Sequence, residues 1–315
     1  MGKRHLSAVT RTQGNNEALK NGSVTPEHFA FDFEEVPILV HAFRRMVRGL
    51  EFDVCEMAAT TYLCAKSFGK PFTALPIFLI RGFHQGAILY NTRSGIRTPK
   101  DLEGRRVGVN RGYTVTTGVW ARGILQDDYD VDPRRVTWVL SGDDHVAEYR
   151  PPANVVSMPA GQTLEGMLIA GELDAVIGVQ VTHPDVAPLI PDSLAVGLES
   201  LRRDGIYPIN HLVVVKDELL EEFPDLARDV FGAFARAKAL YVDKLRAGTI
   251  HEPTATDLLH ARVMEATGAD PLPYGIESNR VTIEKLISHA VRQSIIERAP
   301  AVESLFAAST LELSA

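Results

Sequence analysis

The sequence predicts an α/β fold of two lobes, with two strands that cross between them. In the middle of the chain, strand and helix patterns alternate, with strands at 106–110, 136–140 and 174–179 and helices at 114–125 and 164–170. This alternation predicts a parallel sheet flanked by helices. The β-type stretch at 72–90 is interrupted by the polar, glycine-containing segment 81–86, an interruption typical of a chain that passes from one lobe to the other.

The first lobe is predicted from both ends of the chain. Near the N-terminus the patterns predict strands and helices in alternation, at 5–10, 17–21, 29–33, 38–50 and 52–57. A second crossing strand is expected at 207–215, and the sequence after it is chiefly helical. We therefore expect lobe I to hold residues 1–89 and 208–315, lobe II to hold residues 90–207, and a ligand cleft to lie between the lobes.

Composition and charge narrow the class of function. The chain has 315 residues, of which 45% are hydrophobic, enough for real globular cores. A net charge of −7 without a basic block argues against nucleic acid as a partner. No apolar run approaches the roughly 20 residues of a membrane span, and the first residues lack an apolar signal segment. We expect a cytoplasmic protein without a membrane partner, as a monomer or a homo-oligomer, with Cys55 and Cys64 as buried free thiols.

Several strong motifs are absent, among them GxGxxG, GxxxxGK[ST], HExxH, CxxC and GxSxG. Dinucleotide redox chemistry, phosphoryl transfer and serine hydrolysis therefore lose support. The ten histidines are dispersed and show no metal-ligand spacing, so neither a metal site nor another cofactor is predicted.

A turn from strand to helix is predicted around Asn110, Tyr113 and Thr114. The free N–H groups of a helix start, together with the nearby hydroxyl groups, favour a carboxylate. The same pattern also fits a tight turn and a capped helix without a ligand.

Two further candidates, Arg81 and His84, lie in the interrupted β-type stretch. Arginine can clamp a carboxylate with two hydrogen bonds, and histidine can exchange a proton near neutral pH. A surface arginine paired with an acid, and a histidine packed between domains, would give the same pattern.

Glu56 and His211 are the remaining candidates for proton transfer. Glu56 ends a predicted strand, and ligands of open α/β sheets gather at the carboxyl ends of strands. His211 enters the second crossing strand, where it is expected to face the same cleft as Arg81. The alternatives are an ion pair for Glu56 and a structural role for His211.

Six segments resemble the 4,5-dihydroxyphthalate decarboxylase family, and together they span nearly the whole chain. They are EFDVCEM at 51–57, SGIRTPKDL at 94–102, VWARGILQD at 119–127, YPINH at 207–211, DPLPYGIESNR at 270–280 and LFAASTL at 305–311. The resemblance implies a type II periplasmic-binding-protein fold and decarboxylation of a dihydroxylated benzene dicarboxylate to a catechol acid. Where the family usually reads Arg-x-Phe-Arg-His-Ser, this chain reads RGFHQG at 81–86. The substrate is therefore expected to be 4,5-dihydroxyphthalate or an analogue with differently placed anionic groups.

The expected reaction is a non-oxidative, cofactor-free decarboxylation of a small aromatic carboxylate. Arg81 and the turn at Tyr113 and Thr114 would hold the carboxylate, His84 or His211 would act on the phenol, and Glu56 would supply the proton. The full set of predicted substrate-binding residues is Thr10, Arg11, Thr60, Arg81, Asn110, Tyr113, Thr114, Asn210 and Tyr274.

Two other functions share the same scaffold. A solute-binding protein or ligand sensor would bind a small organic acid in the same cleft without chemistry. An enzyme of thiamine-pyrimidine synthesis would require a cysteine-rich, histidine-containing motif, for which this sequence has no counterpart.

Overall fold

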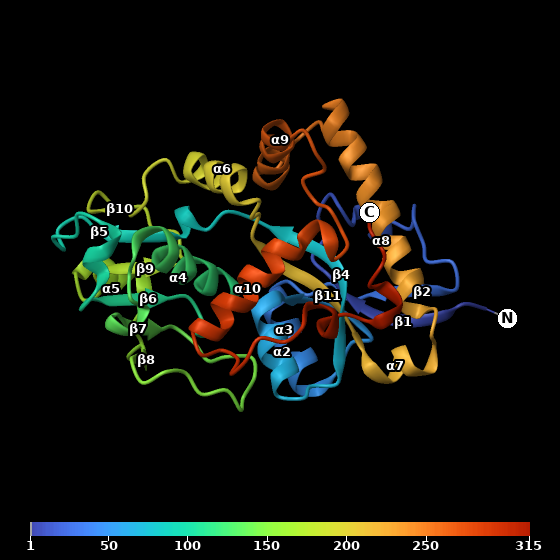
Figure 1. Cartoon of the computed structure of the whole chain (residues 1–315), viewed down its shortest axis with the longest axis horizontal. Coiled ribbons are helices and arrows are strands. Elements are labelled where there is room, and N and C mark those ends of the chain that lie inside the picture. Colours follow the sequence, from blue (N-terminus) through green and yellow to red (C-terminus); the bar gives the residue numbers. More distant parts are fainter. Residues whose placement is uncertain (1) are drawn as a thin grey trace. The chain divides into compact units, whose positions relative to one another are not determined.

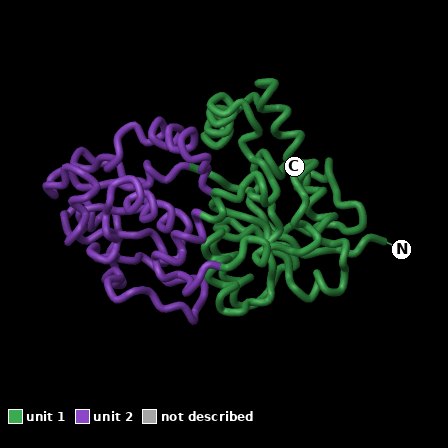
Figure 2. Tube along the Cα trace, viewed as in Figure 1, with its two compact units in different colours: residues 1–82, 209–284, 300–315 green, residues 83–208, 285–299 purple. Residues whose placement is uncertain are grey.

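The computed structural model describes residues 2–315, which form two compact units (Figure 2). Unit 1 contains the chain up to Gly82, together with Ile209–Glu284 and Pro300–Ala315. Unit 2 contains Phe83–Pro208 and Lys285–Ala299. The predicted lobe I differs from unit 1 in that it included residues 83–89, residue 208 and residues 285–299, all of which belong to unit 2.

The segment 285–299 joins unit 2 through charged and polar side chains. Lys285 and Arg292 both form ion pairs with Asp127, at 2.8 and 2.7 Å. Gln293 accepts a hydrogen bond from Arg122 Nε at 2.8 Å. These contacts link residues more than 150 positions apart, so the helical pattern of the segment could not assign it to a unit.

Unit 1 is built on a mixed five-stranded sheet in the order β2-β1-β3-β11-β4 (Figure 1). Its strands are β1 (Arg4–Val9), β2 (Phe29–Phe33), β3 (Val54–Ala58), β4 (Phe72–Arg81) and β11 (Ile209–Lys216). β1 pairs in parallel with β2 and β3, whereas β11 runs antiparallel to both β3 and β4. The carboxyl ends of β1, β3 and β4 therefore meet the start of β11 at one edge of the sheet.

The helices of unit 1 pack on this sheet or on one another. They are α1 (Glu17–Lys20), α2 (Leu39–Gly49), α3 (Ala59–Ser67), α7 (Asp217–Glu222), α8 (Leu226–Ala247) and α9 (Ala255–Thr267), with short 3₁₀ turns at Glu277–Asn279, Val302–Leu305 and Ala308–Thr310. α8 packs on β4, and α3 packs on β3, β4 and β11. The buried cluster includes Leu6, Ile77, Val213 and Phe234, so the core joins sheet and helix residues from both ends of the chain.

Unit 2 contains a six-stranded sheet in the order β10-β5-β9-β6-β7-β8. Its strands are β5 (Ile88–Asn91), β6 (Arg106–Val109), β7 (Thr137–Leu140), β8 (Val155–Ser157), β9 (Ala175–Ile177) and β10 (Val186–Pro188). Its helices are α4 (Thr116–Tyr129), α5 (Leu164–Ala170) and α6 (Ser193–Asp204), with 3₁₀ turns at Gln85–Ala87, Pro99–Leu102 and Pro133–Arg135. α10 (Arg280–Arg292) begins in unit 1 and ends in unit 2.

The parallel arrangement predicted for the middle of the chain is present. β9, β6, β7 and β8 are parallel neighbours, and β5 is antiparallel to both of its neighbours, β9 and β10. Cys55 and Cys64 are buried free thiols, as expected. Within residues 2–315, none of the helices combines the length and the apolar character of a membrane span.

Candidate functional site

Polar side chains gather at the edge of the unit 1 sheet where β1, β3 and β4 end and β11 begins. His211 is paired in register with Ala58 of β3, and Ile209 is paired with Arg81 of β4. Thr10 directly follows β1. This strand order brings together residues that lie more than 120 positions apart in the sequence.

Glu56 and His211 form a close pair at this edge. Glu56 Oε1 lies 2.6 Å from His211 Nδ1, and Glu56 Oε2 accepts a hydrogen bond from the backbone N–H of Arg11 at 2.8 Å. The Glu56 side chain is 0% exposed and that of His211 is 17% exposed. The imidazole also packs edge-on against the Phe43 ring, with 5.1 Å between ring centres.

This geometry fixes the orientation of the histidine. A carboxylate bonded to Nδ1 selects the ring tautomer, and it leaves Nε2 for proton exchange. Because both Glu56 oxygens already have protein partners, the carboxylate is better placed to orient His211 than to meet a substrate directly. The pairing is not visible in the sequence, since it depends on the antiparallel register of β11 with β3.

Arg81 ends β4 and is buried. Its Nη2 atom donates a hydrogen bond to the side-chain oxygen of Asn279, and it lies 3.5 Å from the Pro273 carbonyl oxygen. Tyr274 is fully buried nearby, and burial raises the pKa of its hydroxyl well above the ordinary value. The negative charges of Asp270 and Glu56 also raise this pKa, whereas the positive charge of Arg81 lowers it.

The other predicted residues of unit 1 differ in their exposure. Thr10 is buried and accepts a hydrogen bond from Asn16 at 3.2 Å. Thr60 is buried in the first turn of α3, Asn210 is half-buried on β11, and the side chain of Arg11 is exposed. Thr60 and Asn210 therefore lie on elements that meet the same edge of the sheet, and Arg11, shortly after β1, contacts Glu56 through its backbone.

Unit 2 holds the remaining predicted residues. α4 begins at Thr116, two residues after the predicted start, and Asp144 accepts hydrogen bonds from both the N–H and the hydroxyl of Thr114 at 2.7 Å. The groups expected to bind a substrate carboxylate at Thr114 thus already have an internal carboxylate as partner. Asp144 carried no signal in the sequence, because it lies thirty residues away.

Tyr113, Asn110 and His84 are also held within unit 2. The Tyr113 carbonyl accepts a hydrogen bond from the buried Arg122 at 2.6 Å, and the Arg122 guanidinium lies 3.9 Å from the Tyr113 ring centre. Asn110 donates to the Gly178 carbonyl at 2.8 Å, which joins the ends of β6 and β9. His84 is buried next to a 3₁₀ turn. Their substrate-binding and catalytic roles stay predictions.

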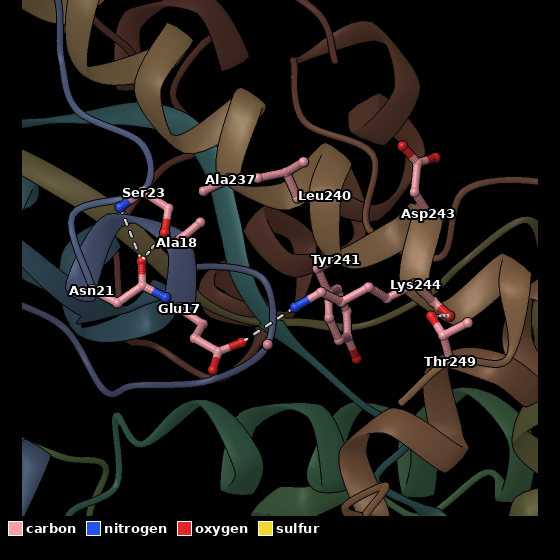
Figure 3. Close-up of a pocket in the computed structure, with 11 residues that line it drawn as sticks. Glu17, Ala18, Asn21, Ser23, Ala237, Leu240, Tyr241, Asp243, Lys244 and Thr249 are labelled. Atoms are coloured by element: carbon pink, nitrogen blue, oxygen red, sulfur yellow. Dashed lines mark hydrogen bonds and ion pairs between the residues drawn. The ribbon is translucent and has the colours of Figure 1, made fainter. Parts of the chain in front are cut away.

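A cavity of about 410 Å³ lies elsewhere in unit 1, between α1 and α8 (Figure 3). Lys244 and Glu17 face each other across it at 3.8 Å, and Tyr241 forms part of its wall. None of the predicted site residues lines this cavity. Among residues 2–315, no group of three or more His, Cys, Asp or Glu side chains is placed to hold a metal ion.

Comparison with curated proteins identifies two relatives with the same name. The chain is 28% identical over 312 residues to the 4,5-dihydroxyphthalate decarboxylase of Comamonas testosteroni, covering 92% of this chain and 90% of that protein. It is 35% identical over 164 residues to the 4,5-dihydroxyphthalate decarboxylase of Pseudomonas putida, covering 48% of this chain and 63% of that protein. No family model matches the chain.

Solved structures with the same fold include both binding proteins and an enzyme. The periplasmic aliphatic sulphonate binding protein SsuA from Escherichia coli superimposes with a TM-score of 0.56 at 10% identity, covering 99% of this chain and 100% of that one. The desulfurization enzyme DSZB gives a TM-score of 0.54 at 13% identity, covering 97% and 96%. These likenesses bear on the fold alone. The chain thus has the two-lobed α/β fold of periplasmic binding proteins, and its predicted resemblance to the 4,5-dihydroxyphthalate decarboxylase family is confirmed.

Proposed function

We propose that the protein is a carboxy-lyase that decarboxylates 4,5-dihydroxyphthalate, or a close analogue, to a catechol acid without oxidation and without a cofactor. The two curated relatives that carry this activity in their names support the reaction. The single structural observation that supports it best is the buried Glu56–His211 pair at the carboxyl edge of the unit 1 sheet. A cytoplasmic location is part of the same proposal.

In the proposed mechanism, His211 is the group that exchanges protons with the substrate. We assign this role to His211 instead of Glu56, because the carboxylate is fully buried and both of its oxygens are engaged. Glu56 then holds the ring tautomer and stabilises the imidazolium that forms when Nε2 takes a proton. The Arg11 backbone N–H keeps the carboxylate in place.

The chemistry removes one proton from the phenol, delivers one proton to the ring carbon and returns one proton to the phenolate of the product. In 4,5-dihydroxyphthalate each carboxylate is para to a hydroxyl group, so deprotonation of that phenol by His211 moves electron density onto the carbon that bears the carboxylate. A proton then bonds to this carbon, and the bond to the carboxylate breaks with loss of carbon dioxide. The electron pair of the broken bond restores the aromatic ring. Each turnover consumes one proton in total and releases a dihydroxybenzoate.

The test combines turnover with one substitution. With 4,5-dihydroxyphthalate as substrate, His211→Asn is expected to lower kcat by about 100- to 10,000-fold, the usual contribution of a general acid–base group. His5→Asn is a matched control, because His5 belongs to an exposed histidine–carboxylate pair of the same sheet, 2.8 Å from Asp32. It should change kcat by less than about twofold.

Two outcomes would count against the proposal. Equal turnover by the wild type and His211→Asn would remove His211 from the reaction. Tight binding of the dicarboxylate without release of carbon dioxide would favour a solute-binding protein or a ligand sensor, which is the alternative that the fold permits.

A further inference from the structure

The segment 270–280 was singled out by its resemblance to the family, yet only Tyr274 of this segment was among the predicted substrate-binding residues. The segment begins at Asp270, whose carboxylate contacts the Lys238 ammonium and accepts the Leu272 N–H at 2.7 Å. Lys238 is almost fully buried on α8. Removal of one partner from such a pair would leave the other charge without compensation, which is strongly destabilising. The pair therefore fixes the start of the segment to α8.

The middle of the segment is attached to β4. The Gly275 N–H donates to the Pro76 carbonyl at 2.8 Å, and Tyr274 exchanges backbone hydrogen bonds with Ala315 at 2.7 and 3.2 Å. Gly275 has φ of +104°, and a Cβ atom there would lie 2.5 Å from the Leu313 carbonyl oxygen. Only glycine fits this position. The segment is therefore fixed against the strand that carries Arg81.

Both the nitrogen and the oxygen of the Asn279 carboxamide form hydrogen bonds in the protein interior. The amide nitrogen donates to the carbonyl oxygens of Pro273 and Gly275, at 3.0 and 2.7 Å, and the amide oxygen accepts from Arg81 Nη2. A flipped amide would place its nitrogen against the Arg81 donor and its oxygen against two carbonyls. The surrounding backbone thus determines which atom Arg81 meets.

The hydroxyl of Tyr274 gives a second, independent observation at the same place. It is fully buried, and within residues 2–315 no hydrogen-bond partner is found for it. Leaving a buried hydroxyl unpaired costs about 1–3 kcal/mol, so such groups commonly mark a place where a water or a ligand completes the bonding. The Lys238 ammonium lies 5.0 Å from the centre of the Tyr274 ring, and the charge of Arg81 also acts on the hydroxyl. Both are cations that favour an anion.

We propose that Asn279 is a positioning residue that orients the Arg81 guanidinium, so that Arg81 and the Tyr274 hydroxyl together bind one carboxylate of the aromatic dicarboxylate. The inference deepens the proposed function and rests on it for the identity of the ligand. Asn279 touches Arg81 and not the substrate. Its effect should therefore appear in substrate affinity and should pass through Arg81.

The test is a double-mutant cycle on Arg81 and Asn279, measured as KM for 4,5-dihydroxyphthalate and as Kd for phthalate. Arg81→Lys and Asn279→Ala should each raise both constants by at least about tenfold, as expected for losing one charge-assisted hydrogen bond. kcat should change by less than about threefold. In the Arg81→Lys background, Asn279→Ala should add less than about threefold, because contacting residues are not additive. Additive effects, or an unchanged KM in Asn279→Ala, would overturn the inference.

Two further variants guard against a loss of folding. Asn91→Ala removes a buried asparagine that donates to the Leu168 carbonyl at 2.7 Å in unit 2, and it should leave both constants within about twofold. If Asn279→Ala does not fold, the isosteric Asn279→Asp replaces it. Its carboxylate would neutralise Arg81, so phthalate affinity should fall at least about tenfold. Unchanged affinity would overturn the inference.

The phthalate measurement separates this inference from the proposed function. A wild type that binds phthalate through Arg81 and Asn279 but releases no carbon dioxide would contradict the proposed function and support the positioning role. Conversely, if the enzyme is active but Asn279→Ala changes neither KM nor phthalate affinity, the proposed reaction is supported and the positioning role is overturned. A wild type that does not bind phthalate would overturn the carboxylate site itself.

Discussion

The replacement Glu56→Gln tests the pairing with His211 at the level of single hydrogen atoms. Glu56 accepts from the Arg11 N–H at 2.8 Å and pairs with His211 Nδ1 at 2.6 Å. A carboxylate can accept on both oxygens, whereas the glutamine carboxamide has one accepting oxygen and one donating nitrogen. One of the two partners must therefore meet an NH₂ group.

The two possible orientations of the glutamine differ in free energy. With its oxygen toward His211, the nitrogen would meet the Arg11 N–H, and two buried donors would stay unpaired at a cost of roughly 1–3 kcal/mol. With its oxygen toward Arg11, the nitrogen would donate to Nδ1 and the ring proton would move to Nε2. The second orientation keeps every hydrogen bond, so we expect it to dominate.

The expected result is a folded protein with the wrong histidine tautomer. Nε2 would then carry a proton and could not accept one, so kcat should fall by about 100- to 10,000-fold. KM should change little, because Arg81 is untouched. Steady-state kinetics and thermal unfolding measure both effects. Asp53→Asn is the matched control, since Asp53 precedes the same strand and accepts the Ser7 N–H at 3.0 Å. A kcat for Glu56→Gln within about threefold of this control would refute the reasoning.

Two further predictions concern stability. Gly123→Ala should lower the free energy of unfolding, because a Cβ atom there would lie 2.5 Å from the buried His289 ring. The overpacking cost of about 1–3 kcal/mol outweighs the gain in helix propensity of about 1 kcal/mol. Gly232→Ala should instead raise the free energy of unfolding, because its Cβ atom would meet only the flexible end of Arg236. Burial lowers the pKa of His260 and His289 to about 4. Below pH about 6.5, these two histidines therefore bind protons in the unfolded chain but stay neutral in the folded chain. The free energy of unfolding should fall by roughly 3 kcal/mol per histidine as the pH drops to about 4. Denaturant unfolding of the wild type and His260→Gln at several pH values measures this, and an equal pH slope in both would contradict it.

Regular elements with a strong local pattern were predicted well. The alternating phenylalanines placed a strand at 29–33 and the structure has β2 at Phe29–Phe33, while the apolar spacing placed a helix at 164–170 and the structure has α5 at Leu164–Ala170. Both segments carry their signal within a few residues of sequence. Their burial patterns agree with their period, so tertiary contacts had nothing to override.

Elements and contacts that depend on distant partners were missed. β8 and β10 have three residues each, and their hydrogen bonds come from neighbouring strands. α4 starts two residues later than predicted, and the Thr114 that precedes it is bonded to Asp144, thirty positions away. Asn279 lay inside a segment recognised by resemblance, yet its bond to Arg81 joins positions 198 residues apart. No local pattern records such a contact.

The site was predicted as a set of candidate residues, and the structure adds the geometry of part of it. Glu56 and His211 were expected near the same cleft with separate tasks, whereas they form one hydrogen-bonded pair. That contact is the reason for changing the proposed role of Glu56 from supplying the proton to orienting His211. Sequence reasoning could identify residue types suited to acid–base chemistry, but not the register of β11 that joins them.

The most direct test of the proposed reaction is the stoichiometry of 4,5-dihydroxyphthalate turnover by the purified chain in oxygen-free buffer. The proposed chemistry predicts one carbon dioxide and one 3,4-dihydroxybenzoate for each substrate molecule consumed, without added oxidant. In deuterium oxide it also predicts one deuterium at the carbon that lost its carboxylate. Product formation that requires an oxidant, or binding without any release of carbon dioxide, would contradict it.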